Sequence, residues 1–252
     1  LNNSTNNNIL YFKSTINEVI ILPTTHEIDK ITEALATTNI IDWNKELLAP
    51  FADTVVLNVI SNILPRVGIM IKGQVCTIKH FLPKTSPLQT IDRTARVIFS
   101  IQCQKICVLF VIIFIIDFSA PQGTYMGPLK YENIEQVDRA WPHRHESSTW
   151  FFKLLIDNDL TYGLFSDDHS LLAWVTICEV GFLTHLYCEE KHRKKGYAEY
   201  VAKYVSNKRL KEGKDVFCYI LEENIKSIKL FRKIGFEVIG RGCWTNLAPV
   251  EN

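Results

Sequence analysis

A phosphate-binding turn is predicted by the types and spacing of one short run, Arg193-Lys194-Lys195-Gly196-Tyr197-Ala198. The run follows residues 181–188, a stretch typical of a β-strand, and it opens a stretch typical of a helix. Glycine lets a ligand approach the backbone closely, and the first N–H groups of a helix lack intrahelical acceptors. Together with the helix dipole and Arg193, these N–H groups predict a pyrophosphate site.

The elements that position this turn follow a regular order from about residue 129 onward. Apolar periodicity, capping residues and turn signals predict helix, helix, three strands, helix, strand, helix and strand. This order indicates a mixed α/β domain. The predicted ranges are 132–140, 148–158, 161–166, 171–178, 181–188, 196–212, 215–220, 224–234 and 236–244.

The element order, the turn at residues 193–198 and the run from Asn224 to Phe236 together resemble the GNAT superfamily of N-acyltransferases. Within it, three further runs resemble the glycine N-acyltransferase-like branch. They are Trp141-Pro142-His143-Arg144, Gly163-Leu164-Phe165 and Leu172-Ala173-Trp174-Val175. The resemblance covers residues 129–246. It implies a mixed, mostly antiparallel GNAT-type sheet flanked by helices, and the N-terminal part would be a smaller, degenerate α/β half.

The resemblance also implies the co-substrate, which would be acyl-CoA or acetyl-CoA, with no metal. Residues 193–198 would hold the pyrophosphate through main-chain N–H groups. The backbone of the preceding strand would bind the pantetheine arm, and the helix after Asn224 would border the cofactor. The cofactor-binding residues expected outside the turn are Leu186, Tyr187, Cys188, Asn224, Ser227 and Phe231.

A general base must deprotonate the amine before it attacks the thioester. Here the chain departs from its relatives, because Phe182 stands where the glycine acyltransferase branch carries a glutamate base. Phe231 stands where many superfamily members place an acid tyrosine. Three residues can replace the base: His185 on the same strand, Glu179 at the turn before it, and Thr184, which can position a water.

Each candidate has a structural alternative. His185 can be a hydrogen-bonded core histidine on the face opposite Phe182, and Glu179 can be an exposed turn residue. Cys188 or Cys218 could carry the acyl group, or both could be inert buried thiols. For the substrates, we expect Arg144 to meet a carboxylate of the acceptor. Phe182 would line the acyl end and favour chains longer than acetyl.

These residues predict an N-acyltransferase that moves an acyl group from coenzyme A to glycine, another amino acid or a small amine by direct attack. A catalytically impaired acyl-CoA-binding protein and a protein lysine or N-terminal acetyltransferase stay open as alternatives. We expect a monomer with a small-molecule acceptor and neither a nucleic-acid nor a membrane partner, since the net charge is +1. The expected location is intracellular, either cytoplasmic or mitochondrial.

The seven cysteines form no CxxC pair, so we expect free thiols in a reducing compartment rather than a disulfide framework. The chain begins at Leu1 rather than Met, so it is expected to be a fragment or an incomplete gene product, and a targeting peptide can precede it.

Four segments are expected along the chain: an Asn-rich, disordered end at 1–10, an α/β support domain at 11–95, an apolar insert or linker at 96–126, and the GNAT domain at 127–252. Within the insert, residues 106–116 are apolar without a break, and at eleven residues they are shorter than a membrane span. The run is interpreted as a buried strand or packing segment; a membrane anchor and a translated intron stay open.

Overall fold

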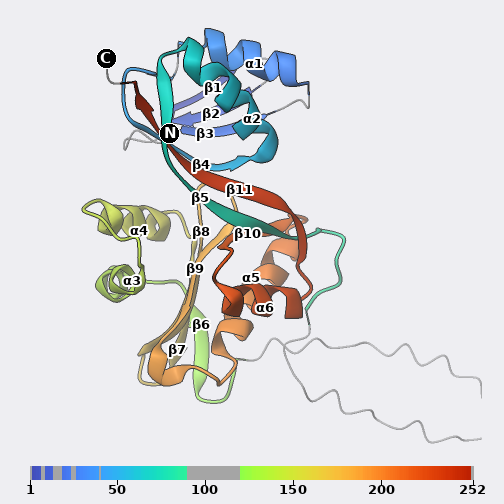
Figure 1. The fold of residues 1–252 in the computed structure, drawn as a ribbon. Helices are drawn as coiled ribbons and strands as arrows, with labels where there is room; N and C mark the ends of the chain where they lie inside the picture. The colour runs from blue at the N-terminus through green and yellow to red at the C-terminus, as the bar shows by residue number, and fades with distance from the viewer. Residues whose placement is uncertain are drawn as a thin grey trace, which may run out of the picture. The chain divides into compact units, whose positions relative to one another are not determined.

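The computed structural model describes residues 2–6, 9–13, 19–23, 27–39, 41–89 and 120–250. The chain divides into two compact units, Leu1–Phe81 with Phe217–Asn252, and Leu82–Val216 (Figure 1). The expected boundaries differ, because they placed everything after residue 127 in one domain. The difference arises from β11, whose strand neighbours both lie within the first 82 residues.

The first unit contains two groups of strands. Strands β1, β2 and β3 form a three-stranded antiparallel sheet, while β4, β11, β5 and β10 are neighbours in that order in a larger sheet. The strands are β1 (Asn2–Asn6), β2 (Ile9–Lys13), β3 (Val19–Pro23), β4 (Leu47–Asp53), β5 (Ile69–Leu82), β10 (Val216–Leu221) and β11 (Glu237–Pro249).

The expectation of disorder for residues 1–10 is wrong for the residues in β1 and β2. Asn2 pairs with Lys13 and Asn6 with Ile9 in an antiparallel ladder, so this polar end forms backbone hydrogen bonds. A strand can form here despite the Asn-rich composition, because a ladder satisfies main-chain groups whatever the side chains are.

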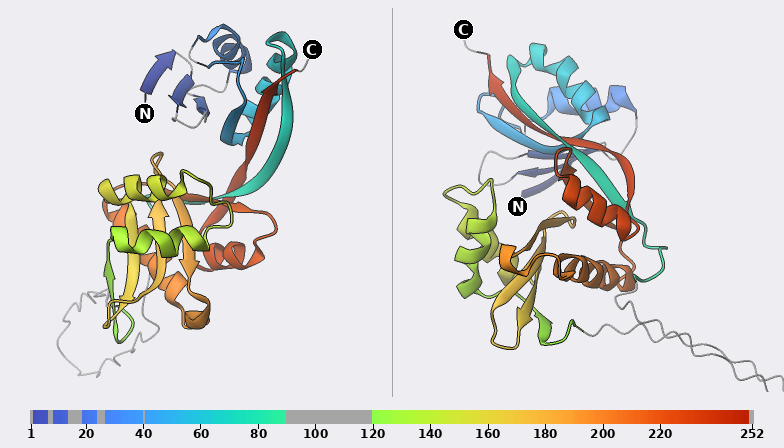
Figure 2. Two further views of the ribbon diagram at one scale, coloured as in Figure 1. Left: turned by 90° about the vertical axis from the view of Figure 1, so that its left-hand side faces the viewer. Right: turned by 60° about the horizontal axis from the view of Figure 1, so that its bottom comes forward.

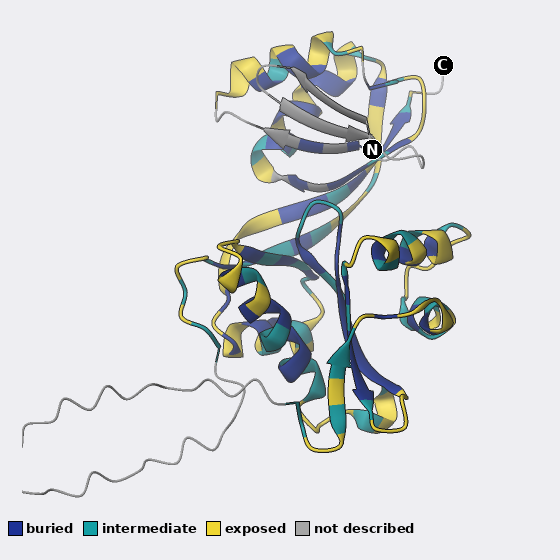
Figure 3. Ribbon diagram, turned by 180° about the vertical axis from the view of Figure 1, so that it is seen from behind, coloured by how far each residue is buried: buried dark blue, intermediate teal, exposed yellow. Residues whose placement is uncertain are grey.

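Helices α1 (Ile28–Thr37), α2 (Thr54–Ile63) and α6 (Ile225–Lys233) also belong to the first unit, with the 3₁₀ turn η1 (Leu64–Arg66) after α2. Helix α2 buries Val56, Val59, Ile60 and Ile63, the spacing of one helix face. This face packs in an apolar cluster with α1 and β4. Figure 3 shows the same pattern in these helices, with buried residues facing inward and exposed residues on the outer surfaces.

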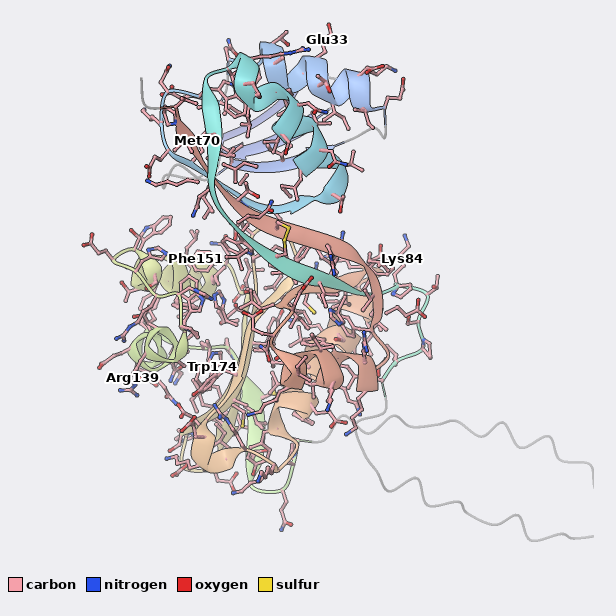
Figure 4. The ribbon with its side chains drawn as sticks, viewed as in Figure 1. Glu33, Met70, Lys84, Arg139, Phe151 and Trp174 are labelled. Atoms are coloured by element: carbon pink, nitrogen blue, oxygen red, sulfur yellow. A yellow bond between two sulfur atoms is a disulfide. The ribbon has the colours of Figure 1, made fainter. Side chains whose placement is uncertain are left out.

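Strands β5 and β11 pair along nearly their whole length, from Glu237 opposite Phe81 to Pro249 opposite Ile69. In the middle of this ladder Cys76 lies opposite Cys243, and the two form a disulfide, drawn as the yellow bond in Figure 4. The expectation of free thiols is therefore wrong for this pair, which sequence spacing could not show because 167 residues separate the two cysteines. Cys178, Cys188 and Cys218 are free and buried.

The second unit has four antiparallel strands in the order β9, β8, β7 and β6. They are β6 (Thr124–Gly127), β7 (Thr161–Ser166), β8 (Leu171–Ile177) and β9 (Leu183–Cys188). The helices are α3 (Ile134–Ala140), α4 (Ser148–Asp157) and α5 (Tyr197–Lys211), with 3₁₀ turns η2 (Tyr131–Asn133) and η3 (Glu190–His192). Figure 2 shows α3 and α4 on one face of these strands and α5 on the opposite face.

The core under α3 and α4 is aromatic. Trp174 of β8 and Phe152 of α4 are both about 1% exposed, and Phe165 and Leu155 pack with them. Gly163 belongs to the same core because a Cβ there would lie 2.8 Å from side-chain atoms of Leu171 and Phe165. The residue is glycine because this core leaves no room for a side chain.

The α/β fold with a mostly antiparallel sheet flanked by helices is confirmed. Strand β6 lies in the segment expected to be a linker, and β4 was not predicted. The apolar run at 106–116 lies outside the described residues. In the part of the chain that the structure describes, every helix is too short or too polar to span a bilayer.

Candidate functional site

The start of α5 is an open helix N-terminus. Gly196 caps it in the left-handed conformation, with φ of 83°, and its own N–H lies in the predicted phosphate-binding turn. Nothing lies within 4 Å of where a Cβ would stand on Gly196, so the backbone is accessible from that side. The amide of Tyr200, at the end of the first turn, donates to Gly196 O at 2.9 Å. The amides of Tyr197 and Ala198 come earlier, so no carbonyl oxygen within the helix can accept their hydrogen bonds.

The loop before Gly196 is strongly basic, since Lys191, His192, Arg193, Lys194 and Lys195 are consecutive. The side chain of Arg193 braces this loop: Nε donates to the carbonyl oxygen of Cys188 at 3.2 Å, and Nη1 lies 3.0 Å from Oε1 of Glu190. Arg193, expected as a phosphate ligand, thus already has partners here. Lys194, with φ of 65°, places a second left-handed residue two positions before Gly196.

Strand β9 carries a β-bulge at His185. Trp174 pairs with Tyr187 and Thr176 with Thr184, so three steps along β9 correspond to two along β8. The φ of His185 is 52°, the left-handed conformation that one bulge type requires at its extra residue. The bulge interrupts the alternation expected for this strand and the backbone pairing beside Leu186.

His185 is held in an aromatic cage. Its ring lies 4.8 Å from Trp141, 5.0 Å from Phe152 and 5.9 Å from Phe151, and its Nδ1 is 2.9 Å from Oγ1 of Thr176. Burial lowers the pKa of His185 to about 4, so the ring is neutral at pH 7. Phe151, which contributes to this cage from α4, is labelled in Figure 4. This arrangement favours the structural alternative for His185.

Sequence reasoning missed the cage. Trp141, Phe151 and Phe152 come from the end of α3 and from α4, and nothing in their spacing points to a histidine more than 30 residues away. Likewise, no sequence pattern indicated that Thr176 would contact His185. The left-handed conformation of His185 has no signal in the sequence.

Glu179 lies between β8 and β9, and it is less exposed than expected. Its Oε2 is buried and has no hydrogen-bond partner among the described residues. An unpaired buried acceptor costs about 1–3 kcal/mol, so this oxygen needs a hydrogen-bond donor that the described residues do not supply. Thr184 is partly buried, and its carbonyl oxygen accepts a hydrogen bond from Oγ1 of Thr176 at 3.3 Å.

The free cysteines are poor nucleophiles. Burial raises the pKa of Cys178 to about 12, with the charge of Glu179 contributing, and burial also raises the pKa of Cys188 and Cys218. The side chain of Tyr187, next to Cys188, is tilted over Trp174 at 4.9 Å, and the guanidinium of Arg193 lies 5.4 Å from its ring.

Asn224, Ser227 and Phe231 belong to the first unit. Oδ1 of Asn224 accepts from the amide of Ser227 at 3.2 Å and so caps α6. Phe231 is 3% exposed and meets Phe236 edge to face at 5.0 Å. These contacts are capping and packing roles.

The two residues expected at the substrates lie in different surroundings. Arg144 is exposed in the loop between α3 and α4, where its amide donates to Trp141 O at 3.2 Å. Phe182 is 4% exposed just before β9. Among the described residues no cluster of three or more His, Cys, Asp or Glu side chains could hold a metal ion.

The FR47-like protein family matches residues 161–245, which include β7, β8, β9, α5, β10 and α6. No protein with a curated description matches the sequence. The chain is similar in structure to a Drosophila protein, with a TM-score of 0.72 and 17% identity over 96% of this chain and 74% of that one.

Two bacterial structures described as GNAT-family acetyltransferases are also similar. The Novosphingobium aromaticivorans protein has a TM-score of 0.54 and 13% identity over 98% of this chain and 91% of its own. The Colwellia psychrerythraea protein has a TM-score of 0.52 and 13% identity over 96% and 81%. At these identities the likeness defines the fold, which is that of the GNAT-type acetyltransferases.

Proposed function

We propose that this protein is an N-acyltransferase that transfers an acyl group from acyl-CoA to the amine of glycine, another amino acid or a small amine. The observation that carries the proposal is the open N-terminus of α5 behind Gly196, preceded by a run of five basic residues. Main-chain N–H groups, the positive end of the helix dipole and nearby lysines are complementary to a pyrophosphate.

The bulge in β9 supports the proposed binding of the pantetheine arm of the cofactor. Because two residues of β9 stand opposite one of β8, backbone groups near His185 and Leu186 do not follow the regular ladder. An amide-rich arm such as pantetheine binds by forming hydrogen bonds with strand backbone of this kind. Leu186 thus keeps its proposed role through main-chain atoms, whereas Tyr187 and Cys188 pair with Trp174 and Ala173 of β8, and the carbonyl oxygen of Cys188 also accepts from Arg193.

Glu179 is the proposed general base. The amine of an amino acid is an ammonium at neutral pH and must lose a proton before its lone pair attacks the thioester carbonyl. The unpartnered Oε2 of Glu179 can receive that proton through a bound water. His185 fits the role less well, since a pKa of about 4 makes its ring a weak base.

Direct attack is favoured over transfer through a cysteine. Burial raises the pKa of Cys178, Cys188 and Cys218, so their thiolates are scarce at neutral pH. The glycine N-acyltransferase-like branch, to which the runs at Trp141–Arg144 and Leu172–Val175 are similar, makes glycine the first acceptor to try.

The test is a thiol-release screen of acetyl-CoA and longer acyl-CoAs against glycine, other amino acids and arylalkylamines. The parent should release thiol only when a suitable amine is present, and Glu179→Gln should lower kcat by about 100-fold or more. Glu135→Gln, an exposed carboxylate on α3, is the matched control and should keep full activity.

Three outcomes would count against different parts of the proposal. Stabilisation by coenzyme A without thiol release from any pair would favour a non-catalytic acyl-CoA-binding protein. If coenzyme A neither binds nor stabilises the protein, the assignment of the α5 N-terminus is wrong. Equal kcat for the parent and Glu179→Gln would exclude Glu179 as the base.

A further inference from the structure

Helix α6 concentrates positive charge on one side. Four of its nine residues are exposed cations and none is acidic: Lys226, Lys229, Arg232 and Lys233. The whole chain, by contrast, has a net charge of only +1. At about 3.6 residues per turn, the four side chains project within about one third of the circumference of the helix. The opposite side carries Ile228 and Phe231, which are buried. We call the four exposed cations the cationic arc.

The stability of the helix does not favour this arrangement. Lys229 is three or four residues from each of the other cations of the arc, and like charges at these spacings weaken a helix. Lys226 also lies in the first turn, which carries no acid, and there the positive end of the helix dipole disfavours it. Features that lower stability without a packing reason are expected at functional surfaces.

The arc also lacks internal partners. Within the part of the chain that the structure describes, Lys226, Lys229 and Arg232 form no ion pair. The cations of α5 differ in this respect, since Lys203 lies 3.0 Å from Glu199, one turn away on the same helix. An exposed arc whose charges are left unpaired is complementary to an extended anionic surface.

Three exposed aliphatic side chains accompany the arc. Ile225, in the first turn of α6, is 52% exposed, and Val238 and Ile239, in β11 just after the helix, are 46% and 50% exposed. The register between β11 and β5 shifts between Val238 and Gly240, so Ile239 has no partner on β5. Apolar side chains thus occur before and after the arc in the sequence.

Val238 lies near the C-terminal end of α6. It is opposite His80 of β5, which is fully buried. Burial is the main cause that lowers the pKa of His80, and the charge of Arg232 adds to it. Because a charge shifts a pKa mainly at short range, Arg232 lies close to the end of the ladder at Val238. A cation and an exposed aliphatic residue are therefore neighbours here.

This combination favours a lipid surface over a nucleic acid. Lysine and arginine attract anionic headgroups, and aliphatic side chains enter the boundary between headgroups and acyl chains. A single-stranded nucleic acid needs exposed aromatic rings on which its bases stack. The aromatic residues of this region, Phe231 and Phe236, are both buried.

We infer that the cationic arc binds this protein to membrane surfaces that carry anionic lipid. Helix α6 then lies on the membrane, with Ile225 and Ile239 in the headgroup layer, and no part of it spans the bilayer. The expectation of no membrane partner was based on the net charge of the whole chain. That sum does not reveal the concentration of charge on α6.

The experiment is co-sedimentation of the full chain with vesicles of phosphatidylcholine alone or of phosphatidylcholine and phosphatidylserine in equal parts. Binding to the phosphatidylserine vesicles should be about tenfold stronger or more, since each cation at the surface contributes. It should weaken as salt is added, because salt screens the charges. Equal binding to both kinds of vesicle, or binding to neither, overturns the inference.

A double variant locates the contact. Lys226→Gln with Lys229→Gln should weaken binding to phosphatidylserine vesicles about tenfold or more. The matched control is Lys30→Gln with Lys45→Gln, which removes the same charge from two exposed lysines of the same unit outside the arc. The control should bind like the parent. If the two double variants bind alike, the arc is not the contact and the inference fails.

Two further measurements separate lipid from other anions. Ile239→Ser should weaken vesicle binding about fivefold, because its side chain no longer enters the interface. Unchanged binding of this variant would leave charge as the sole contact and overturn the role of the aliphatic residues. A short DNA duplex should not displace the protein from vesicles at equal phosphate concentration, and displacement would assign the arc to nucleic acid instead.

Coenzyme A carries phosphates too, so its affinity is measured on the same variants. Lys226→Gln with Lys229→Gln should keep the coenzyme A affinity and the thiol release of the parent when vesicles are absent. A loss of coenzyme A affinity would assign the arc to the cofactor and overturn the membrane contact. Vesicle binding requires neither acyl-CoA nor an amine, so its failure and that of the proposed acyl transfer are distinguishable.

Discussion

Two strand-to-helix turns, one in each unit, solve the same chemical problem in opposite ways. Helix α5 begins at Gly196, which has no side chain to accept a hydrogen bond from the first turn. Helix α6 begins at Asn224, whose Oδ1 accepts from the amide of Ser227. Both helices start with N–H groups that need acceptors. The turn at Asn224 supplies a side-chain acceptor, whereas the turn at Gly196 supplies none, which is why the cofactor is proposed to bind there.

The strands before the two helices differ in the same sense. Burial along β10 alternates regularly from Val216 to Leu221. Strand β9 is buried only at its ends and bulges at His185. An irregular strand followed by a helix without a side-chain cap is a combination that packing alone does not require, and it supports the proposed cofactor site. The turn at Asn224, in the first unit, is therefore an internal control for the turn at Gly196, in the second unit.

The largest expected effect is a loss of stability at low pH caused by His185. If the side chain of His185 were instead part of an open site, this loss would not occur and the comparison between the two turns would fail. The pKa of His185 is about 4 in the fold and about 6.5 in an unfolded chain, so the unfolded state binds more protons between these values. Stability is then fully present above pH 6.5 and is lost as pH falls toward 4. The loss amounts to about 3 kcal/mol.

Chemical denaturation of the parent and of His185→Phe between pH 7 and pH 4 measures this loss. The difference between the two curves isolates the histidine from the carboxylates that titrate in the same range. Parallel curves would mean that His185 titrates like an exposed histidine. The cage would then be open, and His185 would return as a candidate base.

The next prediction replaces the glycine cap of α5 by a residue with a capping side chain. In Gly196→Asp, a carboxylate stands at the open N-terminus, where it competes for the amides of α5 and repels a pyrophosphate. Affinity for coenzyme A should fall about tenfold or more, a loss of about 1.4 kcal/mol or more, measured by calorimetry.

Gly213→Asp is the matched control, because Gly213 also has a positive φ, 69°, with nothing within 4 Å of its Cβ position. It lies at the other end of α5, so the backbone strain is comparable while the turn is untouched. Equal coenzyme A affinity in both variants would remove the open N-terminus from the proposed site.

The sequence predicted the elements of this comparison more completely than their side-chain contacts. Strand β7 was predicted at its observed bounds, and α5 and α6 within one or two residues, because apolar periodicity and capping residues are local signals. The glycine of the turn was marked for the same reason. Asn224, expected from the sequence as a cofactor-binding residue, caps α6 in the structure.

The rest depends on residues far apart in the chain. The alternation expected for β9 fails at His185 because the bulge is set by pairing with β8, and the cage is built from α3 and α4. The pairing of Cys76 with Cys243 and the burial of one Glu179 oxygen are likewise tertiary.

The smallest expected effect is that of removing the side-chain cap of α6, which tests the comparison at the closed turn. Asn224→Ala removes the acceptor of the Ser227 amide and should lower the free energy of unfolding by about 1 kcal/mol, while Asn224→Ser, which keeps a capping oxygen, should restore most of it. Neither variant should change the affinity for coenzyme A, because the acceptor of Asn224 is used within its own helix. Denaturation and calorimetry on the same samples check both statements. A loss of affinity that Asn224→Ser fails to repair would show that the amide group of Asn224 binds the cofactor as well, so that the turn of α6 is only partly closed.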